Sequence, residues 1–239
     1  MSGHSKWATT YRQKAIIDAK RGAIFTKLGN LITIAAKNGG DPEKNPALRA
    51  AIDRAKGFSM PKDNIERAVK RGTGELVGDQ IEELYYEGLI PPSIQIVVKC
   101  VTDNKNRSGA SVRHIFSKNG GAFGSVLWNF EQKGVIQINQ EEIKNNKINI
   151  DDLELELIDL GIDDLIKENE GLSIHMGVEN LQKIKDFLDS KKLKNESAEI
   201  EYIPKEKISL NNEETDKLEK VFAELEDNED VSDYYTNLV

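Results

Sequence analysis

The chain has 239 residues, of which 38% are hydrophobic and 31% are charged, so it can bury at least one ordinary core. No apolar run reaches the roughly 20 residues that a membrane-spanning helix requires, and the opening residues lack the apolar stretch of a secretory signal. We therefore expect a cytoplasmic protein with no membrane partner.

The formal net charge of −8 is divided unevenly along the chain. Residues 1–74 hold 15 Lys and Arg against 6 Asp and Glu, a net charge of +9, so the remaining 165 residues carry −17. A local excess of positive charge attracts a polyanion even when the whole protein is acidic. Function is therefore sought first in residues 1–74.

The residue types that carry most catalysis and metal binding are sparse. Cys100 is the one cysteine; it lies in an alternating apolar run and is interpreted as a buried packing residue of a strand. His4, His114 and His175 show no zinc-ligand spacing, and no nucleophile motif such as GxSxG occurs. We expect a non-enzymatic protein with no metal, no cofactor and no small-molecule substrate.

Helices are predicted in the basic part of the chain. Apolar residues recur every three to four positions over residues 24–36, which makes one helical stripe. Asn45-Pro46 is typical of an N-cap followed by proline in the first turn, and it opens a helix that ends at Gly57. A third helix is predicted over residues 61–72. Together they indicate a helical bundle with a basic leading segment.

The pattern changes at the glycine-rich segment 72–78, after which strands and helices alternate. Strands are predicted over residues 84–87, 94–100 and 125–130, with a helix around 111–118. After Pro204 follow a helix from about Asn212 and a strand over residues 231–236. These C-terminal elements are expected to complete the sheet that begins at residue 84.

A separate unit is predicted to begin at Gly134. Its elements are a strand, a helix around 151–160, a strand pair ending at 174–176, a helix over 181–188 and a strand over 198–202. The order β-α-β-β-α-β indicates a ferredoxin-like sandwich. Residues 153–157, LELEL, alternate strictly and fit a strand as well as the helix that we favour.

The predicted fold class is therefore α+β with several domains, an N-terminal all-helical bundle followed by two α/β (ferredoxin-like) domains. The expected boundaries are 1–78 for the basic helical domain, 79–133 plus 205–239 for an α/β domain, and 134–204 for an α/β domain inserted within it.

Cations and aromatic rings are interleaved near the start of the chain. Lys and Arg bracket Trp7 and Tyr11, so groups able to bind phosphate lie beside rings able to stack on a base. Two alternatives stay open: the basic face is merely solvated, or the two rings, four residues apart, pack on each other. Asp18 is the single acid against seven Lys and Arg in residues 1–40, which favours nucleic-acid contact.

Two further motifs combine basic residues with turns. Residues 60–75, MPKDNIERAVKRGTGE, place Arg67, Lys70 and Arg71 at the end of a short helix, where cations also complement the helix dipole, so binding and structural roles are equally supported. The segment 102–108, TDNKNRS, is able to offer an anion-binding helix N-terminus, although turn and capping chemistry explains its residues and is favoured.

Seven motifs together carry a resemblance to a known family. They are GHSKWA at 3–8, DAKRG at 18–22, FTKL at 25–28, MPKDNIERAVKRGTGE at 60–75, YEG at 86–88, TDNKNRS at 102–108 and VRHIFSKNGG at 112–121. Their sequence resembles the YebC family over nearly the whole chain, and the block at 60–75 is long enough to be highly specific. The family includes bacterial proteins described as transcriptional regulators and a mitochondrial translational activator of cytochrome c oxidase. Its fold, a helical domain followed by two α/β domains, agrees with the elements predicted above.

The chain departs from the family pattern in two places. Residues 89–92, LIPP, stand where the family usually has a glycine-rich turn, and the segment after Gly120-Gly121 is shorter than usual. The basic motifs of the first domain are intact. The resemblance therefore implies nucleic-acid contact by basic and aromatic residues of that domain, for which the candidates are Lys6, Trp7, Lys14, Lys20, Arg21, Lys27, Lys62, Arg67, Lys70 and Arg71.

The leading hypothesis is a transcriptional regulatory protein that binds DNA through its basic helical domain. The alternative is a translation factor that binds the ribosome or RNA, and the absence of a helix-turn-helix signature weakens sequence-specific DNA binding relative to it. A third reading is an interaction scaffold, because residues 213–239 hold ten Asp and Glu against two Lys and are able to dock a basic partner or the basic domain itself.

Overall fold

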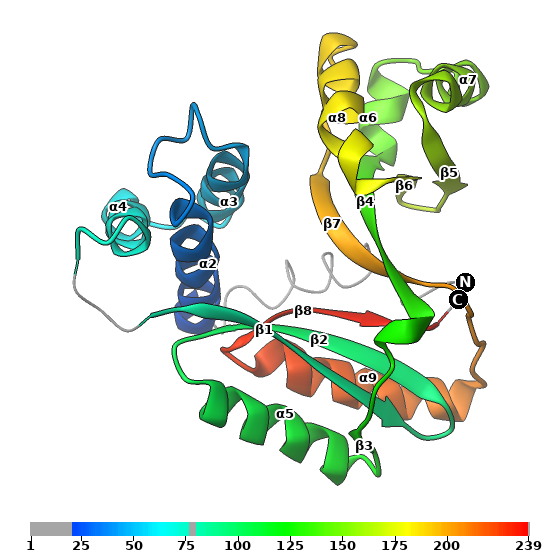
Figure 1. Cartoon of the computed structure of the whole chain (residues 1–239). Helices are drawn as coiled ribbons and strands as arrows, with labels where there is room; N and C mark the ends of the chain where they lie inside the picture. Colours follow the sequence, from blue (N-terminus) through cyan, green and yellow to red (C-terminus); the bar gives the residue numbers. More distant parts are fainter. Residues whose placement is uncertain (1–20, 77–79, 239) are drawn as a thin grey trace. The chain divides into compact units, whose positions relative to one another are not determined.

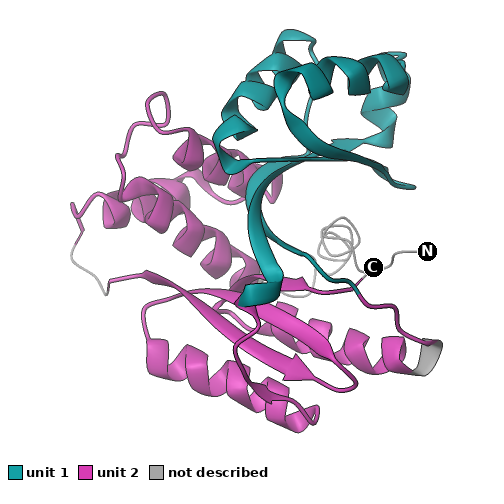
Figure 2. Cartoon of the chain, turned by 45° about the vertical axis from the view of Figure 1, so that its right-hand side comes forward, with its two compact units in different colours: residues 1–10, 128–207 teal, residues 11–127, 208–239 magenta. Residues whose placement is uncertain are grey.

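The computed structural model describes residues 21–76 and 80–238. Within these ranges the chain forms two compact units (Figures 1 and 2). One unit comprises residues 128–207, and the other comprises the described residues up to 127 together with 208–238. None of the helices in the described ranges is long and apolar enough to cross a membrane.

Three helices form the basic part of the larger unit, namely α2 (Arg21–Ala36), α3 (Pro46–Gly57) and α4 (Lys62–Gly72). They share one core made of Leu28, Ile32, Ala36, Leu48, Ile52, Ala55, Met60, Ile65 and Ala68. The side-chain oxygen of Asn45 accepts a hydrogen bond of 3.1 Å from the backbone N–H of Leu48, which caps α3 where the sequence predicts a cap. The three predicted helices are confirmed.

A four-stranded antiparallel sheet forms the rest of this unit, with the strand order β3-β1-β2-β8. Its strands are β1 (Glu82–Ile90), β2 (Ile94–Thr102), β3 (Ala122–Phe123) and β8 (Val231–Thr236). Helices α5 (Lys105–Lys118) and α9 (Asn212–Asp227) cover one face of the sheet (Figure 1). Cys100 lies in this core, fully buried as predicted, and burial raises the pKa of its thiol to about 12.

Two predicted elements of this unit need correction. Helix α5 begins at Lys105 rather than near residue 111, because the side chain of Asn104 accepts a hydrogen bond from the Arg107 N–H and caps the helix six residues earlier. The strand expected over 125–130 is wrong. The backbone N–H groups of Val126 and Leu127 instead donate to the Glu87 carboxylate, at 2.7 and 2.8 Å, and a short 3₁₀ turn η1 (Leu127–Asn129) follows.

The smaller unit contains a second four-stranded antiparallel sheet in the order β5-β6-β4-β7. Its elements are β4 (Phe130–Asn139), α6 (Gln140–Asn145), α7 (Ile150–Leu160), β5 (Ile162–Lys167), β6 (Gly171–Met176), a 3₁₀ turn η2 (Val178–Asn180), α8 (Leu181–Ser190) and β7 (Ser197–Pro204). The succession of the elements along the chain and the order of the strands in the sheet are those of a ferredoxin-like sandwich, with the additional short helix α6. The segment 153–157 is helical.

The core of the smaller unit lies between its sheet and its helices. Ile136, Ile138, Leu172 and Ile174 of the central strands pack against residues of α7 and α8. Helix α7 ends at Gly161, whose φ of 95° is a left-handed conformation that favours glycine. At the base of the sheet, Phe130 pairs with Pro204, so the chain enters and leaves this unit at neighbouring positions. The three-domain boundaries given above stay a prediction.

Candidate nucleic-acid interface

Helix α4 is held against α2 by one face. Ile65 and Ala68 are buried, and the Thr33 hydroxyl on α2 lies 3.1 Å from the carbonyl oxygen of Ala68. Near the end of α4, Gly72 approaches α2 so closely that an added Cβ would lie 2.4 Å from the carbonyl oxygen of Thr33. This packing fixes which side of α4 faces away from the core.

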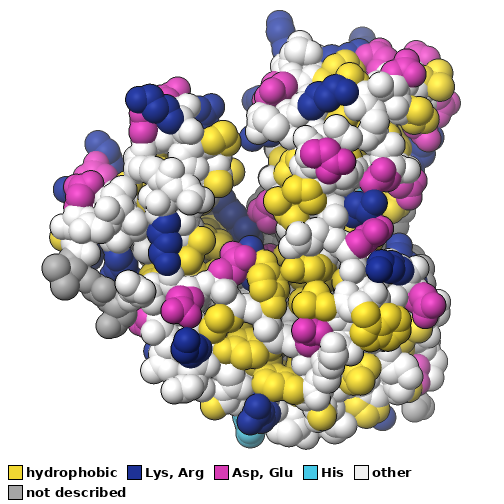
Figure 3. Space-filling model, viewed as in Figure 1, with side chains coloured by type: hydrophobic (Ala, Val, Ile, Leu, Met, Phe, Trp, Pro, Cys, Tyr) yellow, Lys and Arg dark blue, Asp and Glu magenta, His cyan; other side chains and the backbone are white. Residues whose placement is uncertain are grey.

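The outward side of α4 carries the predicted cations. Lys62, Arg67, Lys70 and Arg71 are all exposed, and Lys and Arg side chains are visible on the surface of these helices (Figure 3). Lys62 lies 3.5 Å from Glu66, whereas Arg67, Lys70 and Arg71 form no ion pair with any residue that the structure describes. Three guanidinium and ammonium groups at the C-terminal half of α4 are thus available to phosphate oxygens.

Charge is unevenly distributed along α4. Its first half contains Lys62, Asp63 and Glu66, and its second half contains Arg67, Lys70 and Arg71. The acidic half suits the positive N-terminal end of the helix dipole, and the basic half suits the negative end. A polyanion is therefore attracted chiefly to the C-terminal half of α4, where no acidic side chain of the helix offsets the cations.

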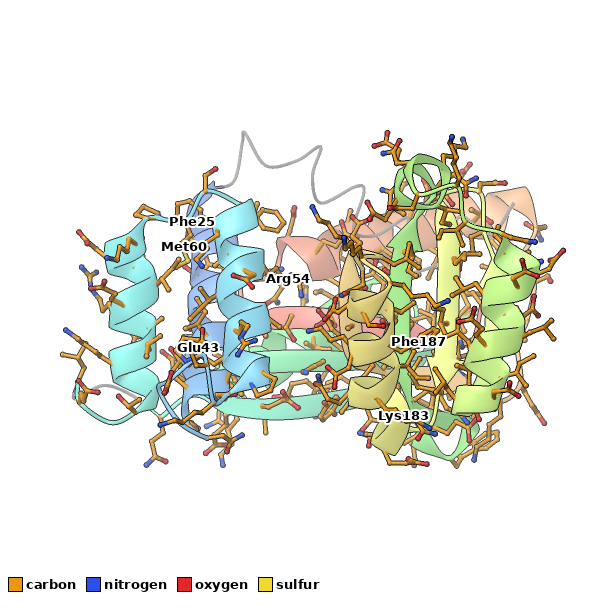
Figure 4. All side chains as sticks on the ribbon, turned by 90° about the horizontal axis from the view of Figure 1, so that it is seen from above. Phe25, Glu43, Arg54, Met60, Lys183 and Phe187 are labelled. Atoms are coloured by element: carbon orange, nitrogen blue, oxygen red, sulfur yellow. The ribbon has the colours of Figure 1, made fainter. Side chains whose placement is uncertain are left out.

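The cations of α3 are used differently. The Arg49 guanidinium donates to the carbonyl oxygens of Pro42 and Glu43, both at 3.0 Å, and Lys56 lies 3.2 Å from the Asp53 carboxylate. Helices α3 and α4 lie on different sides of α2, and α4 packs mainly on α2 rather than on α3 (Figures 1 and 4). The exposed cations considered as a candidate site therefore lie on α4 alone rather than on a paired α3–α4 motif.

Lys27 differs from the other candidates because it is partly buried inside the larger unit. Its ammonium donates a hydrogen bond of 2.5 Å to the carbonyl oxygen of Glu226 on α9. Burial lowers the pKa of Lys27 to about 8, an effect that the nearby Asp233, Glu226 and Asp227 partly oppose. The geometry gives Lys27 a structural contact between α2 and the acidic end of the chain, so we omit it from the phosphate-binding set.

Asn30 of α2 and Lys37, the residue that follows the helix, make similar contacts and were not among the predicted site residues. The Asn30 side chain donates to the carbonyl oxygen of Val101 at 3.3 Å, and the Lys37 ammonium donates to that of Ile81 at 2.5 Å. Lys27 and Asn30 are three residues apart, which places them on one side of the helix. That spacing is the signal from which a docking face could have been predicted.

Five candidates are not placed by side-chain geometry. Lys6, Trp7, Lys14 and Lys20 lie outside the described residues, and Arg21 is the first residue of α2. They stay predictions.

The segment 102–108 is organised by capping and ion pairing. The Arg107 guanidinium binds the buried Asp230 carboxylate through two hydrogen bonds, of 2.6 and 3.1 Å, and also reaches Asp103 at 2.9 Å. Asn104 caps α5. These contacts support the turn-and-cap interpretation that the sequence favours. Within residues 21–76 and 80–238, no cluster of His, Cys, Asp and Glu is arranged to hold a metal ion.

Comparison with known proteins adds an independent line of information. Residues 5–75 match the family model described as the TACO1/YebC protein N-terminal domain, and residues 81–238 match the TACO1/YebC second and third domain. The chain is 45% identical over 242 residues to a probable transcriptional regulatory protein of Caldanaerobacter subterraneus subsp. tengcongensis, with 100% of this chain and 98% of that protein covered. It is 46% identical over 243 residues to one of Pelodictyon phaeoclathratiforme, with 100% and 95% covered.

A solved structure shares the fold. It is the crystal structure of a conserved hypothetical protein from Aquifex aeolicus, which is 36% identical in sequence. The TM-score is 0.83, and the match covers 94% of this chain and 93% of that one.

Proposed function

Because the chain belongs to the TACO1/YebC family, we propose that it is a non-enzymatic regulator of gene expression that binds nucleic acid, with DNA as its ligand, through the basic outer face of α4. The names of its relatives support a regulatory role. The observation that carries the proposal is the exposed group Arg67, Lys70 and Arg71, which has no carboxylate partner among the described residues.

The charge distribution along α4 also supports a second candidate, binding to RNA or to the ribosome. A helix that reads the DNA major groove contacts base edges with its N-terminal residues, and in α4 these include Asp63 and Glu66. Cations confined to the C-terminal half suit contact with a phosphate backbone instead. Such contact serves structured RNA as well as duplex DNA.

The proposal is tested by fluorescence anisotropy with the full chain, using labelled duplex DNA and a labelled structured RNA across a salt series. The Arg67→Gln/Lys70→Gln variant should bind more weakly to every sequence. Its dependence of log affinity on log salt should become shallower by about 2, because each lost phosphate contact removes about one unit of slope.

A matched control removes two positive charges from α3. In the Arg49→Gln/Lys56→Gln variant the net charge changes equally, but the lost groups are bound to loop carbonyls and to Asp53. Equal losses in both variants would reject α4 as the site. If duplex DNA binds more tightly than RNA at equal salt, the DNA assignment stands; saturable binding to one ribosomal subunit that is lost in the α4 variant would replace it with the translational one.

A further inference from the structure

Helix α7 of the smaller unit exposes two large apolar side chains. Leu155 is 65% exposed and Ile158 is 54% exposed, although the helix already buries Leu153 and Leu157 against the sheet. The exposed pair lies three residues apart and so forms one continuous strip on the outward side of the helix. The fold of this unit does not need these two side chains, because the inward side of α7 is already apolar.

Acidic side chains surround this strip. Helix α7 contains Asp151, Asp152, Glu154, Glu156 and Asp159 and no Lys or Arg. Lys167 binds Asp151 and Glu154, at 3.0 and 3.6 Å, Lys191 binds Glu156, and the Lys183 ammonium donates to the Leu160 carbonyl oxygen at the end of the helix, so the five acids meet three lysines. Asp159 has no ion-pair partner among the described residues. Apolar and acidic side chains adjoin on the surface over α7 (Figure 3).

The charge of this surface selects among occupants. Nucleic acids and anionic lipids are repelled by the uncompensated aspartates. A second copy docking face to face through α7 would set the same acids opposite each other, which is unfavourable. A protein segment with apolar side chains flanked by Lys or Arg is complementary in both respects, since apolar anchors supply affinity and opposite charge supplies orientation and rate.

We propose that the outward face of α7, centred on Leu155 and Ile158, is a docking site for a basic amphipathic segment of another protein. This site lies in the unit that does not contain α4, and the proposal does not rest on the function proposed above. The two side chains form the anchor of a small interface, so the expected complex is a transient one.

The test uses the full chain and a fluorescein-labelled synthetic peptide of Leu and Lys, in which the spacing of the residues places Leu on one face of a helix and Lys on the other. Wild-type protein should bind it saturably with one peptide per chain. The Leu155→Ser/Ile158→Ser variant should lose about tenfold or more in affinity, as expected for truncation of central anchors. The Asp152→Asn/Asp159→Asn variant should weaken binding and flatten its salt dependence.

Leu89→Ser is the matched control, because Leu89 is 43% exposed but lies in the other unit beside Ile90 and two prolines. Unchanged binding in this control, with amide chemical-shift changes confined to α7 in the wild type, would support the site. The proposal would be overturned if the control lost as much affinity as the α7 variants, or if either α7 variant kept full affinity. It would also be overturned if a peptide with Glu in place of Lys bound as tightly, or if no saturable binding occurred. Self-association abolished by Leu155→Ser/Ile158→Ser would overturn it in favour of a second copy.

Discussion

The Arg107–Asp230 pair joins the start of α5 to the residue before β8. Asp230 is 5% exposed, and the two hydrogen bonds from Arg107 satisfy both of its carboxylate oxygens. The hydrogen bonds to Asp230 raise the pKa of Arg107, so the guanidinium stays charged over the ordinary pH range. The pair is therefore a structural feature of the larger unit rather than a site for an external anion.

We expect Arg107→Ala to lower the free energy of unfolding by about 2–3 kcal/mol, because it leaves a buried carboxylate without its partner. Urea unfolding measures this. Lys105→Ala is the control, since the ion pair of Lys105 with Glu82 is exposed and 3.8 Å long, and its loss should cost no more than about 0.5 kcal/mol. Equal effects of the two substitutions would contradict the structural role of Arg107.

The candidate site could be predicted in part from sequence. Lys62, Arg67, Lys70 and Arg71 share a helix whose apolar positions are evident, so their exposure follows from periodicity. Lys27 differs from them in being partly buried, because it contacts Glu226, which is 199 residues away in the chain. Local pattern contains no information about such a contact.

The close packing of α4 against α2 depends on Gly72, which has no side chain. At Gly72 an added Cβ would lie 2.5 Å from the Cβ of Ala36 and closer still to the Thr33 carbonyl oxygen, so the two helices could not keep their present separation. Gly57, at the end of α3, has nothing within 4 Å of the same position. The two glycines therefore provide a matched pair.

Gly72→Ala should lower the free energy of unfolding by about 1–3 kcal/mol, because overpacking outweighs the better helix propensity of alanine. Gly57→Ala should be neutral or raise it by up to about 1 kcal/mol. Urea unfolding of both variants, with nucleic-acid affinity measured alongside, checks the pair. If Gly72→Ala is as stable as the wild type, the close approach of α4 to α2 is not as described.

Elements with strong periodicity or clear caps were predicted well, and the remainder depended on tertiary contacts. The helix α3 follows from Asn45-Pro46, and β8 follows from its own apolar residues. Helix α6 has only six residues, which is too short to show a period. The strand wrongly expected over 125–130 is replaced by a turn whose backbone N–H groups bind the Glu87 carboxylate. Glu87 lies on β1, 39 and 40 residues earlier in the chain than the two donors.

The two oppositely charged parts of the chain meet inside the larger unit at Lys27. The side chains of Lys27 and Asn30 on α2, and of Lys37 just after it, bind backbone carbonyls beyond residue 80, and Lys27 reaches the C-terminal helix α9. Part of the positive charge counted in residues 1–74 is therefore used within the protein. The positive charge left for an external anion is therefore smaller than the sequence total indicates, and among the described residues it includes the exposed cations of α4.

Lys27 should make the stability of the protein depend on pH. Its pKa is about 8 in the folded state and 10.5 ordinarily, so between these values the unfolded chain binds more protons, and the free energy of unfolding rises with pH. From pH 7 to pH 9 this group should add about 1 kcal/mol. Lys27→Met removes that contribution, so urea unfolding should show the wild type gaining about that amount relative to the variant.

Lys37→Met is the control. It also breaks a hydrogen bond from a lysine to a carbonyl oxygen, but the lysine is exposed, so the control distinguishes the loss of such a bond from the burial of a charge. A difference between wild type and Lys27→Met that is constant from pH 7 to pH 9, or that moves the opposite way, would show that Lys27 is not buried as a charge between α2 and α9.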